Sequence, residues 1–125
     1  AQNLFISAPT LSQYAAVAVF DDKAELDANV ARYRINRDLL VSGLPDAGFD
    51  RLAPSDGAFY VYADVSRLTN DSPDFCRRLL ADTGIAATSG IDFDPQQGHR
   101  FMRFSYAGPT EHMAEAVRRL TDWRR

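Results

Sequence analysis

The stretch Arg100-Phe-Met-Arg-Phe-Ser-Tyr-Ala107 predicts a β-strand. Aromatic residues are enriched in strands, and successive side chains of a strand point to opposite faces of its sheet. The alternation predicts two sets: Phe101, Arg103 and Ser105 on one face, and Met102, Phe104 and Tyr106 on the other. Arg103 is therefore flanked in the sequence by large apolar residues and shares its face of the strand with Phe101 and Ser105.

Arg103 is the most informative candidate site residue. A mid-strand arginine is rarely buried without a partner, and no carboxylate lies within four residues of it in the sequence. Its planar guanidinium suits bidentate capture of a carboxylate or phosphate ligand. The alternative is a structural ion pair with a distant acid such as Asp64. The residues alone leave both interpretations open.

Working outward, a second strand is expected over residues 58–65 and shorter ones over 51–52 and 85–87. Helices are expected over residues 11–20, from 21 to 42–44, from 72 to a stop at Gly84, and from 110 onward. This order predicts an α+β fold in which helices cover a small antiparallel or mixed sheet. The long irregular loop over residues 88–99 is of a kind that often carries function.

The helices carry further predictions. Thr10 and Gln13 fit a capping box. Residues 14–20 are apolar on every helical face, which favours a missing partner surface; the alternative is a central helix of a small bundle. Two inward-facing sets are expected: Leu26, Val30, Tyr33, Leu40 and Leu44 in the second helix, and Phe75, Cys76, Leu79 and Leu80 in the third.

Composition excludes several classes of protein. The chain has 125 residues, a net charge of −3 and one cysteine, and its pI is near 5.2. The acidity argues against nucleic acid or an anionic membrane as the main partner. No apolar run approaches the ~20 residues of a membrane span. A lone cysteine makes no disulfide framework, so we expect a cytoplasmic protein.

Other reactive residues have ordinary interpretations. Asp92 and Asp94 are expected to be solvated loop charges, because a calcium loop needs further ligands. His99 and His112 show no zinc spacing, so no metal site is expected. Cys76 fits a buried core position.

The order and spacing of four motifs indicate a family. They lie at residues 3–13 (NLFISAPTLSQ), 33–40 (YRINRDLL), 56–62 (DGAFYVY) and 98–107 (GHRFMRFSYA). Together they resemble the C-terminal part of class I/II aminotransferases, the fold-type I enzymes that use pyridoxal phosphate. The resemblance covers essentially the whole chain.

The resemblance implies roles for particular residues. Arg103 matches the arginine that binds the substrate's α-carboxylate. Ser7 and Thr10 are implied to approach the cofactor region of a neighbouring subunit, and Gly57 to lie near the substrate entrance. The loop departs from the family pattern, which has Pro-Gly and Phe-Gly where this chain has Ser89-Gly90 and Phe93-Asp94.

It also implies that residues 1–125 form the small domain alone, with the large catalytic domain absent. The chain would be inactive by itself, with no catalytic or cofactor-binding residue of its own. Its single lysine, Lys23, stands among three carboxylates that favour the ammonium form, unlike a Schiff-base lysine.

Pyridoxal 5'-phosphate would therefore be bound only in a full-length homodimer, acting on an amino acid and a 2-oxo acid. Three alternatives remain: a lyase or synthase of the same fold, a stand-alone module that binds a small carboxylate, and a structural oligomerising domain.

Overall fold

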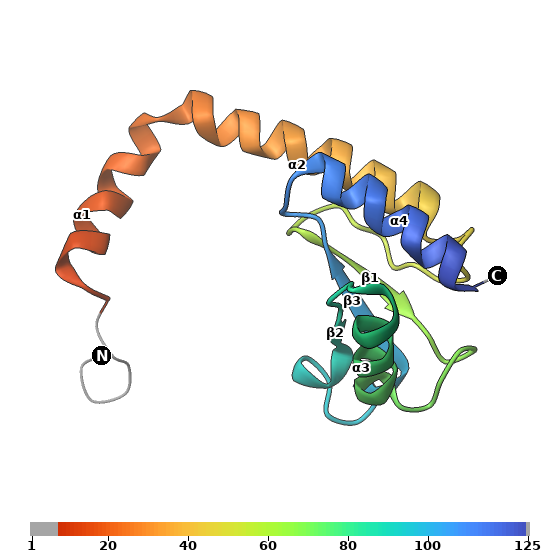
Figure 1. The fold of residues 1–125 in the computed structure, drawn as a ribbon. Helices are drawn as coiled ribbons and strands as arrows, with labels where there is room; N and C mark the ends of the chain where they lie inside the picture. The colour runs from red at the N-terminus through yellow and green to blue at the C-terminus, as the bar shows by residue number, and fades with distance from the viewer. Residues whose placement is uncertain (1–7, 125) are drawn as a thin grey trace. The chain divides into compact units, whose positions relative to one another are not determined.

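The computed structural model describes residues 8–124, and the chain divides into two compact units, residues 1–31 and 32–125. The elements follow in the order α1 (Thr10–Ala18), η1 (Val19–Asp21), α2 (Lys23–Gly43), β1 (Tyr60–Asp64), α3 (Ser72–Thr83), β2 (Thr88–Ser89), η2 (Gly90–Asp92), η3 (Gly98–Arg100), β3 (Phe101–Ser105) and α4 (Thr110–Arg124) (Figure 1). The predicted α+β fold is confirmed. The first five residues of the motif over 3–13, residues 3–7, lie outside the described residues.

Helix α1 begins differently from the predicted capping box. Its N-cap is Pro9, and no side chain caps the helix. Thr10 is already helical, so its hydroxyl is not in the capping position. The Gln13 side chain instead donates a hydrogen bond to the Ala8 carbonyl oxygen at 2.7 Å. The capping-box prediction was therefore wrong.

The apolar surface of α1 and η1 is uncovered. No residue of α1 is buried, and four large apolar side chains are 73–81% exposed: Leu11, Tyr14, Val17 and Phe20. This does not support the central bundle helix. The predicted stripe of α2 is buried only at its C-terminal end, where Leu40 is 2% exposed, whereas Val30 is 56% exposed. Among the described residues, no helix is both long enough and apolar enough to span a membrane.

The sheet is antiparallel and has the order β1-β3-β2. Arg103, at the centre of β3, is paired with Tyr62 on one side and Thr88 on the other. The short strand predicted over 85–87 instead occupies residues 88–89, and Leu52 makes only an isolated bridge to Ala63.

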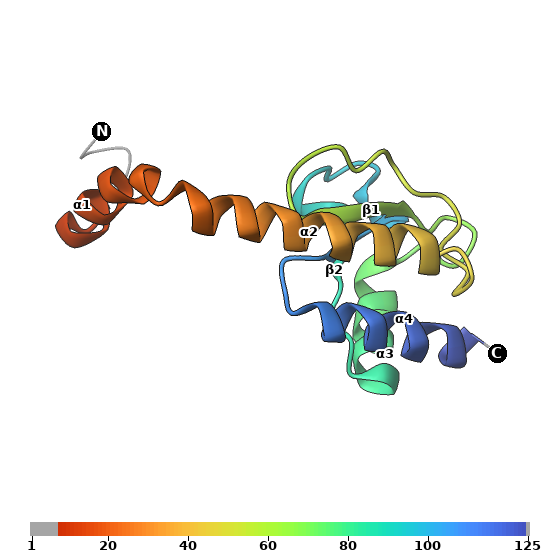
Figure 2. The same ribbon diagram turned by 90° about the horizontal axis from the view of Figure 1, so that it is seen from above.

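One face of the sheet is buried under helices and the other is not. The core face carries Val61 and Ala63 of β1 with Met102 and Phe104 of β3. The helices add Leu40, Phe75, Leu79 and Leu120. The connecting segments supply the other core residues: Leu44, Ala47, Phe49, Val65 and Tyr106. Both views agree that α4 runs alongside the later part of α2 (Figure 1, Figure 2). Arg103 lies on the opposite face.

Helix α3 follows its local signals. Asp71 caps its start by accepting a bond from the Asp74 amide, and Gly84 ends it with φ at 73°, in the left-handed region that glycine adopts freely. Phe75 is buried, as predicted. Leu80, predicted to face inward, is 49% exposed. The stripe of α3 is narrow because a single sheet and α4 cover it.

Asn36 is a buried polar residue that sequence patterning missed. It is fully buried on α2, and its side-chain amide donates to the carbonyl oxygens of Tyr106 at 2.9 Å and Gly108 at 2.8 Å. These bonds satisfy carbonyl groups in the connection between β3 and α4. The asparagine therefore joins three elements across about seventy residues of sequence.

Two glycines close the base of the loop over residues 90–98. A Cβ added at Gly98 would collide with the carbonyl group of Gly90. One added at Gly90 would lie 2.9 Å from the Gly98 carbonyl oxygen and 2.5 Å from the Tyr62 hydroxyl. Ser72, buried at the start of α3, also donates to the Gly98 carbonyl at 3.1 Å. This close packing of Gly90 against Gly98, called the glycine crossing below, holds the loop in place where it leaves and rejoins the sheet.

Gly98→Ala should lower the free energy of unfolding by about 2 kcal/mol, because the backbone atoms of Gly90 cannot move away from the new methyl group. The urea midpoint of the whole protein should fall. Gly57→Ala is the matched control, since nothing lies within 4 Å of its added Cβ. Equal urea midpoints for Gly98→Ala and Gly57→Ala would contradict the close packing of Gly90 against Gly98.

The thiol of Cys76 should be slow to react. Burial raises its pKa to about 11, against roughly 8.5 for a free cysteine. Its rate of reaction with a disulfide reagent should therefore keep rising about tenfold per pH unit from pH 8 to 10. Cys76→Ser identifies the signal, and a plateau below pH 9 would contradict the burial argument.

Candidate functional site

Arg103 projects from the middle of β3 onto the open face of the sheet, in accordance with the predicted alternation. Its side chain is 25% exposed. The ladder with Tyr62 and Thr88 fixes its Cα on both sides. The backbone of Arg103 is thus held in place, and its side chain is only partly hydrated.

Three side chains surround this guanidinium. The ring of Phe93 lies 4.3 Å from its Cζ and that of Tyr60 lies 5.7 Å away, both as cation–π contacts. The Asp92 carboxylate lies 3.5 Å from Nη2. Nε is buried and has no hydrogen-bond partner among the residues that the structure describes. One donor edge of the arginine is therefore incompletely used.

The predicted alternative pair with Asp64 is wrong. Asp64 forms its ion pair with Arg51 at 2.9 Å. It also accepts a hydrogen bond from the Ser66 amide, and the Ser66 bonds are the main cause that holds the pKa of this carboxyl below its usual range. Asp64 faces Phe101 across the ladder, two positions from Arg103. Its charge is already balanced.

The two loop aspartates differ from each other. Asp94 accepts hydrogen bonds from the Gln97 and Gln96 amides, which hold the pKa of its carboxyl below the ordinary value. It shapes the turn and fits the prediction of an ordinary loop charge. Asp92 is 62% exposed, as expected of a solvated charge, but it also faces Arg103. Only folding of the loop brings this pair together.

An aromatic wall lines the open face beside Arg103, and sequence reasoning missed it. Tyr62 and Phe101 are stacked with ring centroids 5.0 Å apart, while Tyr60 and Phe93 are 5.8 Å apart. The alternation of the predicted strand over 58–65 would have placed both tyrosines on the face of Arg103. Phe93 lies in the loop, where no periodicity applies.

The resemblance also implies roles for Ser7, Thr10 and Gly57, which the contacts of the described residues do not test. Ser7 lies outside the described residues, and Thr10 is the exposed first residue of α1. Gly57 lies in the turn before β1, where its carbonyl accepts a hydrogen bond from the Tyr106 hydroxyl at 3.2 Å. The next residue, Ala58, has φ at 59°, so the turn is held in a conformation that alanine rarely adopts. Their functional roles stay predictions.

The single lysine does not fit a covalent cofactor site. Lys23 is 80% exposed and forms an ion pair with Asp27 at 3.1 Å, one helical turn away. Pyridoxal phosphate requires a lysine that is readily deprotonated. No cluster of three potential metal ligands occurs among the described residues.

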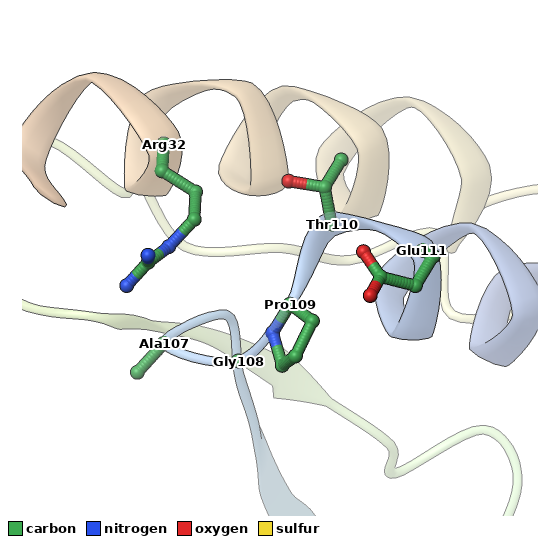
Figure 3. Close-up of a pocket in the computed structure, with 6 residues that line it drawn as sticks. All are labelled: Arg32, Ala107, Gly108, Pro109, Thr110 and Glu111. Atoms are coloured by element: carbon green, nitrogen blue, oxygen red, sulfur yellow. The ribbon is translucent and has the colours of Figure 1, made fainter. Parts of the chain in front are cut away.

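A second feature is a pocket of about 370 Å³ at the start of α4, lined by Arg32, Ala107, Gly108, Pro109, Thr110 and Glu111. Arg32 extends from α2 toward the turn that precedes α4 (Figure 3). Its guanidinium lies 5.5 Å from the neighbouring Tyr33 ring. Arg32 is exposed and none of the six lining residues is buried, so this pocket is more open to solvent than the surroundings of Arg103.

Comparison with known proteins adds the family. The model for aminotransferase class I and II matches residues 1–120. A valine–pyruvate aminotransferase of Mycobacterium tuberculosis is 56% identical over 97% of this chain and 32% of its own length. A (5-formylfuran-3-yl)methyl phosphate transaminase of Methanocaldococcus jannaschii is 35% identical over 98% of this chain and 32% of its own.

Comparison with solved structures finds the same kind of enzyme. The crystal structure of an aminotransferase from Mycobacterium tuberculosis matches 97% of this chain and 32% of its own, with a TM-score of 0.87 and 56% identity. The chain thus spans about a third of the length of the relatives it matches. Since the family model covers nearly every residue, this chain belongs to the class I and II aminotransferases, a family that depends on pyridoxal phosphate.

Proposed function

We propose that residues 1–125 form the C-terminal small domain of a cytoplasmic aminotransferase, which moves an amino group between an amino acid and a 2-oxo acid. The family match and the coverage of only a third of each relative support this assignment. The two compact units of the chain do not oppose it, because a domain junction can include a connecting segment.

Arg103 is proposed to bind the α-carboxylate of the substrate. The observation that carries this is the buried Nε without a partner, on the same guanidinium edge as the weakly paired Nη2. A carboxylate accepts two parallel bonds from such an edge, in a geometry that a lysine does not reproduce. A bound substrate would satisfy the unused donor.

Binding at Arg103 contributes to the reaction by orientation. A carboxylate held at two points, on a side chain mounted in a strand, fixes the substrate's Cα relative to the rest of the site. The aromatic wall excludes water from the guanidinium and strengthens the ion pair that forms. Pyridoxal phosphate supplies the electron sink when bound. Because Lys23 does not fit its attachment, residues beyond this chain hold it, and the chain alone is inactive.

The uncovered apolar surface of α1 and η1 is proposed to contact the large domain or a second subunit of a homodimer. Leu11, Tyr14, Val17 and Phe20 are too exposed and too closely grouped for a surface facing water. Ser7 and Thr10, at the start of the same segment, would then approach the cofactor region of the neighbouring subunit, and Gly57 would lie near the substrate entrance.

Valine and pyruvate are the first substrates to test, because the 56% identical relative is named for them. A lyase or synthase of the same fold remains the second candidate. The products separate the two: a transaminase converts each amino acid consumed into its 2-oxo acid and aminates the acceptor one for one.

Arg103→Lys in the full-length enzyme should lower kcat/KM by about two orders of magnitude, because the charge stays but the bidentate geometry is lost. Steady-state kinetics measure the ratio. Calorimetric titration with propionate, a carboxylate that cannot react, measures binding alone and should show the same loss.

Arg67→Lys is the matched control, since Arg67 is 69% exposed and pairs only with Asp50 on the surface. It should leave kcat/KM unchanged. If Arg103→Lys behaves like Arg67→Lys in both measurements, Arg103 does not bind the substrate.

Val17→Asp should disturb the proposed interface, because a carboxylate buried without a partner is strongly unfavourable. Sedimentation should show loss of the dimer, or thermal denaturation should show a lower midpoint if the covering surface is the large domain. Asp27→Asn, on the exposed start of α2, is the control. No change in either measurement for Val17→Asp would contradict the interface.

A further inference from the structure

We propose that Asp92 is the resident counter-ion of Arg103 and competes with the substrate carboxylate for it, so that this aspartate sets how weakly the site binds carboxylates. The inference rests on the proposed role of Arg103 and adds a residue that limits affinity. It follows from three observations: the length of the ion pair, the donors it leaves unused, and the anchoring of the loop that carries it.

The pair between Asp92 and Arg103 is loose. Its N–O distance is 3.5 Å, whereas the other ion pairs among the described residues measure 2.7–3.1 Å. Asp92 contacts Nη2, and Nε has no hydrogen-bond partner within residues 8–124. A free carboxylate can use both nitrogens at once and therefore binds in a better geometry than Asp92 does.

The loop holds Asp92 near the arginine even so. The Phe93 and Asp94 amides both donate to the Gly90 carbonyl, at 3.0 and 3.1 Å, and the Gly98 amide donates to the Asp94 carbonyl at 2.8 Å. Together with the glycine crossing, these bonds fix the backbone on both sides of Asp92. The local concentration of this carboxylate at Arg103 is therefore high.

Exchange requires the Asp92 side chain to move, together with the atoms that bury Nε. The Asp92 side chain is 62% exposed, so it can rotate into water without losing a buried contact. An incoming carboxylate thus displaces Asp92 and then remains close to its negative charge. Both the displacement and the repulsion weaken substrate binding.

Asp92→Asn in the full-length enzyme tests this. The amide keeps the shape of the side chain and removes its charge. The KM for the amino acid should fall about two- to fivefold, the range expected for an exposed ion pair, with kcat unchanged. Calorimetric titration of the cofactor-free protein with propionate should show a dissociation constant lowered by the same factor.

Two matched variants control the result. Asp46→Asn removes the same charge from an exposed position near the end of α2 and should change neither constant. Asp92→Glu keeps the charge and should restore a KM near that of the parent protein. A KM or a propionate dissociation constant that is unchanged or raised in Asp92→Asn would overturn the inference.

The outcome is distinguishable from failure of the proposed function. If Arg103→Lys abolishes propionate binding while Asp92→Asn leaves it unchanged, Arg103 binds the carboxylate and only the competition is wrong. If Arg103→Lys itself leaves binding intact, both proposals fall. In the double variant, removal of the Asp92 charge should give much less than the gain seen with Arg103 intact, because the competition acts through that guanidinium.

Discussion

The central strand β3 imposes the constraint on which the rest of the structure depends. It pairs with β1 on one side and β2 on the other, so its residues cannot shift without breaking two ladders. Its alternation commits Met102 and Phe104 to the core, which fixes Arg103 on the opposite face. The position of the guanidinium is therefore secured by apolar burial on the other side of the strand.

That placement leaves the guanidinium in an incompletely compensated environment. Two aromatic rings lie near the guanidinium and the Asp92 carboxylate, 3.5 Å away, partly balances its charge. In the described part of the chain, Nε has no hydrogen-bond partner. Removing an arginine from water is costly unless its donors are used. A carboxylate ligand would complete the set, and this is why the same few contacts support both the proposed substrate site and the competition by Asp92.

Much of the fold could be predicted because it follows from local chemistry. Gly84 ends α3 as expected, the alternation over residues 100–107 places both faces of β3, and the strand expected over residues 58–65 contains β1. Two of the errors occurred where tertiary packing, and not a local signal, decides the outcome. The strand expected over 85–87 lies at 88–89, where it pairs with β3. Leu80 is exposed because none of the described elements covers its side of α3.

The candidate site likewise has one part that the local sequence pattern predicts and one part that only the tertiary structure determines. The pattern of β3 is local, so the sequence was enough to single out Arg103, and the ordered motifs were enough to indicate the family. The ion-pair partner of Arg103 could not be predicted from the sequence pattern. Asp92 and Asp64 are both aspartates at a distance in the chain, and pattern alone does not rank them. The folded loop does, because backbone hydrogen bonds and the Gly90–Gly98 crossing bring Asp92 over the open face, while Arg51 already neutralises Asp64.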